Sequence, residues 1–188
     1  MGTTQSPIYD FIFHNLSLMV SPQMPEQLFT EPATIDDLPQ LADLLFDLFS
    51  HEADFIPNQD KQIRGLRLIL EQPSRGRIFV LRNGSRIIGM INLLITISTA
   101  EGGFVLILED LIVHKDHRGQ GYGRHLLEHA LGYARAKNFL RITLLTDKME
   151  ESARAFYEHH GFKQSGMVTM RYYMSPDAKE TVSSKAIP

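Results

Sequence analysis

Two acidic residues interrupt the most apolar stretch of the sequence. Glu109 and Asp110 lie within Phe104–Val113, and the other members of this segment are apolar. A buried charge without a partner costs several kcal/mol, so each carboxylate needs a counter-charge, water or a ligand site. In a regular strand the two side chains would face opposite sides. A carboxylate here could act as a general base toward a bound substrate. The alternative is that it only attracts a cation or pairs with a local lysine or arginine.

A glycine-rich turn follows this segment at once. The run Arg118-Gly119-Gln120-Gly121-Tyr122-Gly123 connects the expected strand to an expected helix. Glycines let the main chain approach a ligand closely, and a helix N-terminus offers N–H groups and a positive dipole end. The turn therefore suits a phosphate or pyrophosphate, with a turn that binds nothing as the alternative. It is neither a Rossmann fingerprint, because Arg124 replaces the third glycine, nor a Walker A loop, because the chain has no Gly-Lys pair.

Two further patterns contain candidate chemical groups. Ala153, Phe156, Tyr157 and His160 share one helical stripe, which predicts that Tyr157 leans on the sheet. It could equally be a core tyrosine with a hydrogen-bonded hydroxyl. Residues 125–129 read His-Leu-Leu-Glu-His, like an inverted zinc-peptidase signature, but both histidines are expected on the outer helix face without a third ligand. No metal site is expected.

The elements that must position these groups alternate along the chain. Hydrophobic periodicity predicts strands over residues 27–33, 76–81, 86–96, 104–113 and 140–145, with one or two closing strands within 164–174. Helices are expected after Thr34 as far as Phe49, and over 61–70, 121–137 and 151–160. This order predicts a mixed α/β fold in three α-β-α layers, with six to seven strands and helices on both faces.

Length and composition limit the function classes. The chain has 188 residues, a net charge of −3 and no cysteine. We expect one domain over 27–174, an N-terminal extension over 1–26 and a polar tail over 175–188. The charge gives no reason to bind nucleic acid or a membrane, and no apolar stretch is long enough to span one. Thiolate chemistry is excluded, the cytoplasm is the default location, and the oligomeric state is open, with a homodimer as one alternative.

The order of these motifs resembles the GNAT superfamily of acyl-CoA-dependent N-acetyltransferases. Arg-x-x-Gly-x-Gly after an apolar strand resembles the family's acyl-CoA loop, and Leu108–Val113 resembles its fourth strand. Residues 150–162 resemble the next helix, with the pairs Phe156-Tyr157 and Gly161-Phe162. The resemblance covers roughly residues 28–174. One departure is Glu150, which stands where the family often has an asparagine that touches pantetheine.

This resemblance implies roles for individual residues. A bulge near Glu109 would splay its strand from the next, with the thioester of acetyl-CoA, the expected co-substrate, in the gap. Glu109 would be the general base and Tyr157 the general acid for the departing thiolate. Pantetheine would pair with the main chain of 111–113, and a main-chain N–H near Leu111 would polarise the thioester carbonyl. The residues implied in acyl-CoA binding are Leu111, Ile112, Val113, Arg118, Gly119, Gln120, Gly121, Tyr122, Gly123, Arg124, Ala153 and Phe156.

The expected acceptor is a small cationic amine. Glu52, Asp54 and Phe55 lie in the loop 51–60, which helps to shape the acceptor site in the family, and together with Asp110 they are the expected substrate-binding residues. An ordinary solvated loop is the alternative. The Leu108–Val113 strand is also similar to that of spermidine/spermine N-acetyltransferases. Without a cysteine, direct attack in a ternary complex is simpler than an acyl-enzyme. A protein or peptide N-acetyltransferase and a non-catalytic acyl-CoA-binding module remain as alternatives.

Overall fold

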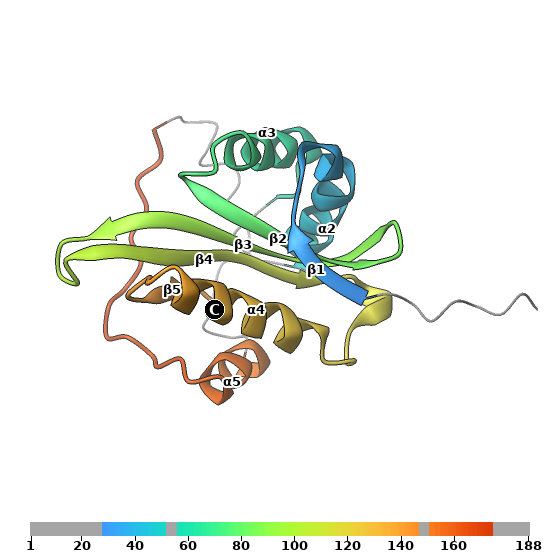
Figure 1. The fold of residues 1–188 in the computed structure, drawn as a ribbon. Coiled ribbons are helices and arrows are strands. Elements are labelled where there is room, and N and C mark those ends of the chain that lie inside the picture. Colours follow the sequence, from blue (N-terminus) through green and yellow to red (C-terminus); the bar gives the residue numbers. More distant parts are fainter. Residues whose placement is uncertain (1–27, 52–55, 147–150, 175–188) are drawn as a thin grey trace, which may run out of the picture.

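The computed structural model describes residues 28–51, 56–146 and 151–174. Figure 1 shows one α/β unit. Its strands are β1 (Leu28–Pro32), β2 (Gly76–Asn83), β3 (Arg86–Ser98), β4 (Gly103–Val113) and β5 (Ile142–Leu144). Its helices are α2 (Leu38–His51), α3 (Gln59–Leu70), α4 (Tyr122–Ala136) and α5 (Glu151–His159), with short 3-10 turns η1 (Ile35–Asp37) and η2 (Lys115–His117). No described helix is long and apolar enough to cross a membrane.

The strands form one mixed sheet in the order β1-β2-β3-β4-β5. The first four pair antiparallel, and β5 pairs parallel to β4. Asn83 pairs with Arg86 across a two-residue turn, where Gly84 adopts a φ of 59°. That conformation favours glycine and explains why Asn-Gly predicts a hairpin here. The crossover from β4 to β5 carries α4, so the glycine-rich turn lies at the carboxyl end of β4.

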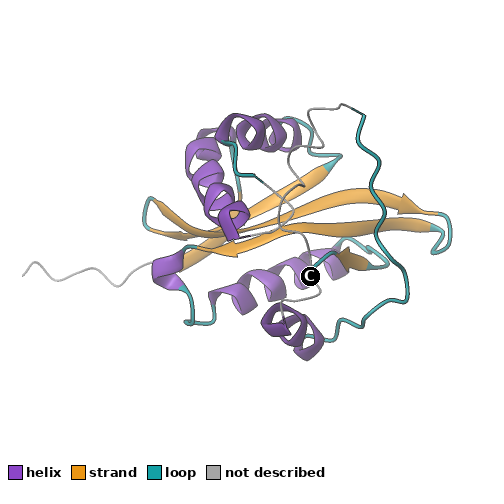
Figure 2. Cartoon of the chain, turned by 180° about the vertical axis from the view of Figure 1, so that it is seen from behind, coloured by secondary structure: helices purple, strands orange, loops and turns teal. Residues whose placement is uncertain are grey.

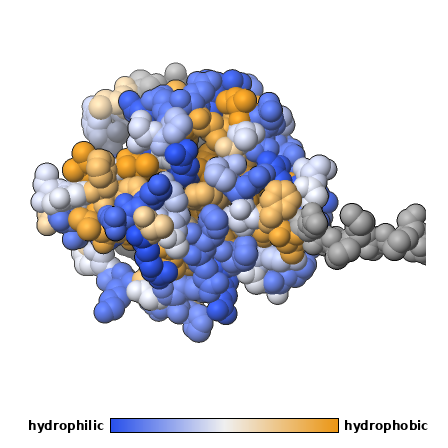
Figure 3. Space-filling view, in the orientation of Figure 1, coloured by the Kyte–Doolittle hydropathy of each residue, from blue (hydrophilic) through white to orange (hydrophobic). Residues whose placement is uncertain are grey.

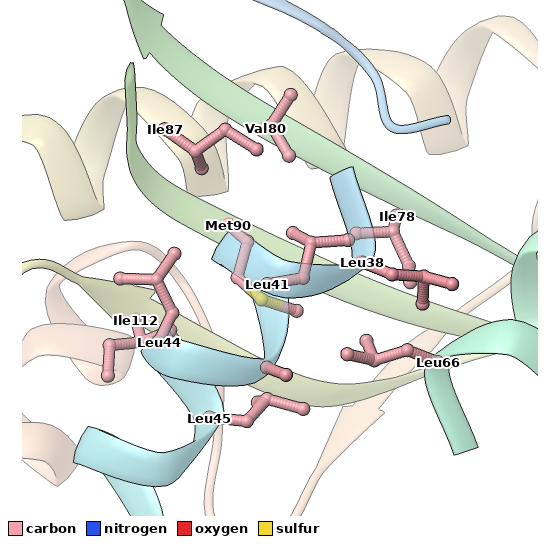
Figure 4. Close-up of a cluster of buried hydrophobic side chains, with 11 residues drawn as sticks. Leu38, Leu41, Leu44, Leu45, Leu66, Ile78, Val80, Ile87, Met90 and Ile112 are labelled. Atoms are coloured by element: carbon pink, nitrogen blue, oxygen red, sulfur yellow. The ribbon is translucent and has the colours of Figure 1, made fainter. Parts of the chain in front are cut away.

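Helices cover both faces of the sheet (Figure 2). On one face, α2 and α3 pack their leucines on Ile78, Val80 and Met90, as Figure 4 shows. On the other face, α4 packs Leu126 and Leu127 on the second buried cluster, which α5 joins through its aromatic residues. The sheet therefore separates two apolar layers, one beneath α2 and α3 and one beneath α4 and α5. This confirms the mixed α/β fold and the helices on both faces.

A buried ion pair fastens the start of α2 to the sheet. The Asp37 carboxylate accepts hydrogen bonds from the Thr34 amide at 2.8 Å and from Arg82 Nη2 at 2.7 Å. Burial would raise the pKa of Asp37, but the hydrogen bonds from Arg82 and Thr34 outweigh it and hold the pKa below its ordinary value. Thr34 and Asp37, which predict a helix start in the sequence, therefore hold that start against the sheet.

The predicted closing strands are not formed. Residues 163–174 run without regular secondary structure, and the described sheet has five strands rather than six or seven. Alternating apolar residues indicate an extended backbone, but a strand also requires a ladder partner. The described part of one chain provides no such partner for this segment.

Candidate active site

A β-bulge separates the two acidic residues of β4. Asp110 pairs with Asn92 of β3 and Leu108 pairs with Leu93, so Glu109 is the extra residue. Leu108 before the bulge and Leu111 after it both pack in the α4 layer, which shows that the side-chain alternation shifts by one residue. The regular alternation expected from the sequence therefore does not hold across Glu109. The bulge implied by the family resemblance is present at this residue.

The same bulge marks the end of the pairing between β4 and β5. The two strands are paired only from Leu106 to Leu108, opposite Ile142 to Leu144. Beyond Leu108, the edge of β4 that faces away from β3 has no strand beside it in the described residues. This opening starts at the two carboxylates and runs toward the glycine-rich turn.

Main-chain groups of β4 line this opening. The His114 amide donates to the Ile88 carbonyl of β3. Because antiparallel ladders alternate, Ile112 also bonds toward β3, whereas the main chains of Leu111 and Val113 point to the open edge. The Val113 carbonyl accepts a hydrogen bond from Arg118 Nε at 2.9 Å. Leu111 and Val113 are therefore placed to pair with an extended ligand, whereas the side chain of Ile112 is buried in the layer beneath α2.

The glycine-rich turn is shaped by left-handed residues. Gly119 has a φ of 75° and Gly121, the N-cap of α4, has a φ of 82°, both in the region that favours glycine. A Cβ added at either position would meet no atom within 4 Å, so the space beside them is open. A Cβ at Gly123 would lie 4.0 Å from Phe156 of α5 and from Val113. The turn thus combines open main chain with contacts to both neighbouring elements.

Arg118 is tied to α2 in this structure. Its Nη2 lies 2.7 Å from Asp47 Oδ2, while its Nε binds the Val113 carbonyl. Roughly half of its side chain is exposed. Arg124, the second cation of the turn, pairs with Glu128 one helical turn away. A phosphate at this turn would therefore compete with Asp47 for the guanidinium of Arg118.

Asp110 and Tyr157 lie near each other at the opening. Asp110 is only 7% exposed and accepts a hydrogen bond from Asn92 Nδ2 at 2.8 Å, whereas Glu109 is exposed. Burial raises the pKa of Tyr157 to about 12, and the Asp110 carboxylate adds to this shift. Tyr157 packs between the rings of Phe156 and Phe162. Its hydroxyl is thus protonated at neutral pH and can donate a hydrogen bond or act as an acid there.

Sequence reasoning missed two residues of this site. Asn92 is 2% exposed and binds Asp110. It is the polar residue of the otherwise apolar run 87–95, the same signal that identified Glu109 and Asp110. Asp47, which holds Arg118, lies 71 residues earlier in the chain. No local pattern could reveal that contact.

Several predicted site residues have no established place in the site. Glu52, Asp54, Phe55 and the departing residue Glu150 lie outside the described residues. Ala153 is half-buried on α5, and Gln120 and Tyr122 belong to the turn.

The histidine pair of α4 is not wholly on the outer face. His125 is exposed and reaches Thr30, but His129 is half-buried with its ring 4.6 Å from that of Phe79.

A separate cavity lies between α2 and the far end of β4. Its volume is about 280 Å³, and its lining includes Asp43, Asp47, Arg86, His114 and Lys115. His114 is four residues beyond Asp110, so the cavity adjoins the turn rather than the carboxylates. Among the described residues, no group of three or more acids and histidines is arranged to hold a metal ion.

Known proteins resemble this chain in sequence and in fold. The sequence model of the Acetyltransferase (GNAT) family matches residues 38–162. Aminoalkylphosphonate N-acetyltransferase of Salmonella typhimurium is 29% identical over 133 residues, 71% of this chain and 83% of that protein. Streptothricin acetyltransferase A of Bacillus subtilis is 38% identical over 78 residues, 42% of this chain and 44% of that protein. An integron cassette protein from a salt-marsh metagenome superposes with a TM-score of 0.67 at 26% identity, covering 78% of this chain and 91% of its own.

The fold and the site therefore define a GNAT-type α/β domain. The family match extends over well more than half of the chain, and it includes β4, the glycine-rich turn and α5. This chain belongs to the acetyltransferase (GNAT) family. It spans less than half the length of several curated relatives that it matches, among them rat N-acetyltransferase family 8 member 2, of which it covers 41%.

Proposed function

We propose that this protein transfers the acetyl group of acetyl-CoA to a primary amine, by direct attack in a ternary complex. The observation that carries the proposal is the opening between β4 and β5. Two carboxylates stand where it begins, Tyr157 lies beside it, and the glycine-rich turn lies at its far end. The opening thus brings together a candidate proton acceptor, a candidate proton donor and a turn that suits an anion.

The turn fits the diphosphate of coenzyme A. Left-handed glycines at 119 and 121 leave room for main-chain N–H groups to approach an anion, and α4 begins there with its positive dipole end. Arg118 supplies a cation once Asp47 releases it. The outward main chains of Leu111 and Val113 would hold the pantetheine arm as an added strand. Phe156 packs against the first turn of α4 and would form the wall beside it.

The residues at the opening divide the proton transfers between them. The thioester supplies an electrophilic carbonyl and a thiol leaving group. Glu109, which is exposed, would accept the proton of the attacking amine directly or through water. Asp110, held by Asn92, would fix the ammonium form of the acceptor nearby as a buried counter-charge. The Tyr157 hydroxyl would donate to the departing sulfur.

The acceptor class follows from the charge of this site. Glu109 and Asp110 place negative charge at the acceptor end, which favours a cationic amine over a neutral or acidic one. The names of two relatives specify an aminoalkylphosphonate and streptothricin as what those proteins acetylate. Small polyamines and aminoglycosides are the first candidates, followed by amino acids and peptides.

An acceptor screen tests the proposal. Free thiol release from acetyl-CoA is measured for polyamines, aminoglycosides, aminoalkylphosphonates, amino acids and peptides. We expect turnover with at least one small amine, a loss of 10²- to 10⁴-fold for Glu109→Gln, and unchanged turnover for Glu158→Gln, an exposed glutamate one residue after Tyr157. Calorimetry should give the same coenzyme A affinity for all three proteins. Binding of coenzyme A without turnover on any acceptor would instead identify a non-catalytic module, and preference for peptides a protein acetyltransferase.

A further inference from the structure

The cavity between α2 and the sheet is lined by charges of both signs. Helix α2 contributes the carboxylates of Asp43 and Asp47, whereas Arg86 at the start of β3 and the segment after β4, with His114 and Lys115, contribute cationic and imidazole groups. Its volume of about 280 Å³ is close to the lower limit of about 300 Å³ for small-molecule sites. The cavity therefore has the size for a small, charged ligand.

This cavity lies away from the exposed apolar surface of the β3–β4 hairpin. The two strands pair from Gly89 and Val113 at one end to Ser98 and Gly103 at the hairpin, so the cavity lies at the opposite end of these strands. Figure 3 shows apolar surface gathered at the hairpin. Recognition at the cavity would therefore depend on its charges.

Three of these charges have no ion-pair partner among the described residues. Arg86 and Lys115 pair with no described carboxylate, and Asp43 accepts a hydrogen bond at 2.9 Å from the neutral amide of Gln59. Asp47, by contrast, is held by a guanidinium at 2.7 Å. Cations and an anion that line one cavity without pairing with each other can bind the opposite ends of one ligand.

His114 adds an N–H group to the cationic side. Its Nδ1 accepts a hydrogen bond from the Asp116 amide at 3.3 Å, so the proton of the neutral ring lies on Nε2. That nitrogen is 3.1 Å from Arg86 Nη2, which can also only donate. Two donors thus face each other without an acceptor, and an oxyanion beside them would accept hydrogen bonds from both.

We propose that this cavity binds a small zwitterion, with its oxyanion on Arg86 and Lys115 and its ammonium group on Asp43. The Nε2–H of His114 is a further donor to the oxyanion. Carboxylate and phosphate share this chemistry, because a guanidinium binds either group with two parallel hydrogen bonds and an ammonium binds either as a point charge. The charged groups of the cavity and of the ligand would then compensate each other.

The rest of the lining limits the body of the ligand. Leu44 and Ile87, both 3% exposed, add apolar surface to the cavity, which suits a short methylene chain between the two charged ends. The site is separate from the opening at Glu109 and Asp110. Its ligand is therefore distinct from the acceptor of the proposed acetyl transfer.

Calorimetry with simple probes gives the first test. β-Alanine and O-phosphoethanolamine carry both charged ends, whereas acetate, inorganic phosphate and propylamine carry one. We expect a Kd below about 1 mM for at least one of the two zwitterions, and at least about tenfold weaker binding of each single-charge probe. The comparison of the two zwitterions distinguishes carboxylate from phosphate. Absence of binding by both at about 20 mM, or equal binding of a single-charge probe, overturns the proposal.

Substitutions locate the ligand. Arg86→Gln and Asp43→Asn should each weaken zwitterion binding at least about tenfold, because each removes a charge-assisted hydrogen bond. Lys115→Gln is a second variant on the cationic side. All three residues are exposed, so the melting temperatures should stay close to that of the wild type. Arg64→Gln, which removes the same charge from an exposed position on α3, is the matched control and should bind like the wild type.

A further variant separates this site from the proposed active site. Glu109→Gln removes the proposed base and should keep the full affinity for the zwitterion. Loss of binding in Glu109→Gln together with wild-type binding in Arg86→Gln would place the zwitterion in the acceptor site and overturn the proposal. The measurement contains no acetyl-CoA, so this inference and the proposed activity can fail separately.

Discussion

Replacing Tyr157 by phenylalanine tests the proposed chemistry at one atom. Tyr157→Phe removes only the hydroxyl and keeps the ring between Phe156 and Phe162. The free energy of unfolding should change by less than about 1 kcal/mol, because only a buried hydroxyl is removed and the packing of the ring remains. Loss of turnover in this variant would therefore report on chemistry rather than on folding.

The size of the loss follows from the pKa of Tyr157. Burial, with Asp110 nearby, raises it to about 12. An alkyl thiol has a pKa of about 8.5, so complete proton transfer from the tyrosine to the thiolate is uphill by roughly 3.5 units, or about 5 kcal/mol. Tyr157 is therefore better suited to hydrogen-bond the sulfur as charge develops. A hydrogen bond to a charged group contributes about 1.5–3 kcal/mol, which predicts a 10- to 150-fold fall in kcat.

Thiol release at saturating acetyl-CoA measures this fall, and calorimetry measures the affinity for coenzyme A. We expect kcat to drop within the stated range while the Kd for coenzyme A changes less than threefold. A Tyr157→Phe protein with wild-type kcat would show that Tyr157 is a core residue only. A fall well beyond 10³-fold would show that the tyrosine transfers its proton fully, and that the site lowers its pKa when substrates bind.

Four other substitutions test the supporting structure. Gly121→Ala should lower the free energy of unfolding by about 1–2 kcal/mol, because the φ of Gly121 is 82°. Gly132→Ala, within α4, should raise the free energy of unfolding by roughly 0.5–1 kcal/mol. Urea denaturation measures both changes. Asp37→Asn breaks the buried ion pair at the start of α2 and should cost about 2–4 kcal/mol at pH 7. Because that pair holds the pKa of Asp37 below its ordinary value of 3.8, its stabilisation is present above this pH and disappears as the pH falls further, so the mutant and wild-type curves should converge in acid. Asp47→Asn removes the carboxylate that holds Arg118 in an exposed ion pair, and this pair contributes less than about 1 kcal/mol. Because Arg118 would then be available to the phosphates, calorimetry should show coenzyme A binding two- to fivefold tighter. Unchanged or weaker binding would show that Arg118 does not contact the phosphates.

The helices and most strands could be predicted from the sequence because their signals are local. Apolar periodicity, the Asn-Gly turn and the terminal glycine of α5 depend on neighbours within one or two turns. The bulge at Glu109 came from the family resemblance, because a polar residue in a strand indicates only that something interrupts the alternation. The position of the bulge could be inferred from the sequence, but the contact of Asp110 with Asn92 depends on the register of the strands.

Long-range contacts explain what the sequence could not show. Arg118 has the sequence context of a phosphate ligand, yet in the folded chain it meets Asp47 on a different layer. The closing strand was predicted from side-chain alternation alone, and alternation does not specify a partner edge. Residues 163–174 therefore have the composition of a strand without its hydrogen bonds in the described chain.

The single extra residue in β4 also determines which sequence changes the strand can tolerate. Substitutions at Glu109 alter one side chain, whereas deleting this residue would remove the bulge and make Leu108 and Asp110 neighbours in a regular ladder. Leu111 would stay on the α4 side and Ile112 on the α2 side, because the deleted residue is the one without a partner on β3. A deletion at this position would therefore remove the irregularity beside the opening while both apolar layers keep their side chains.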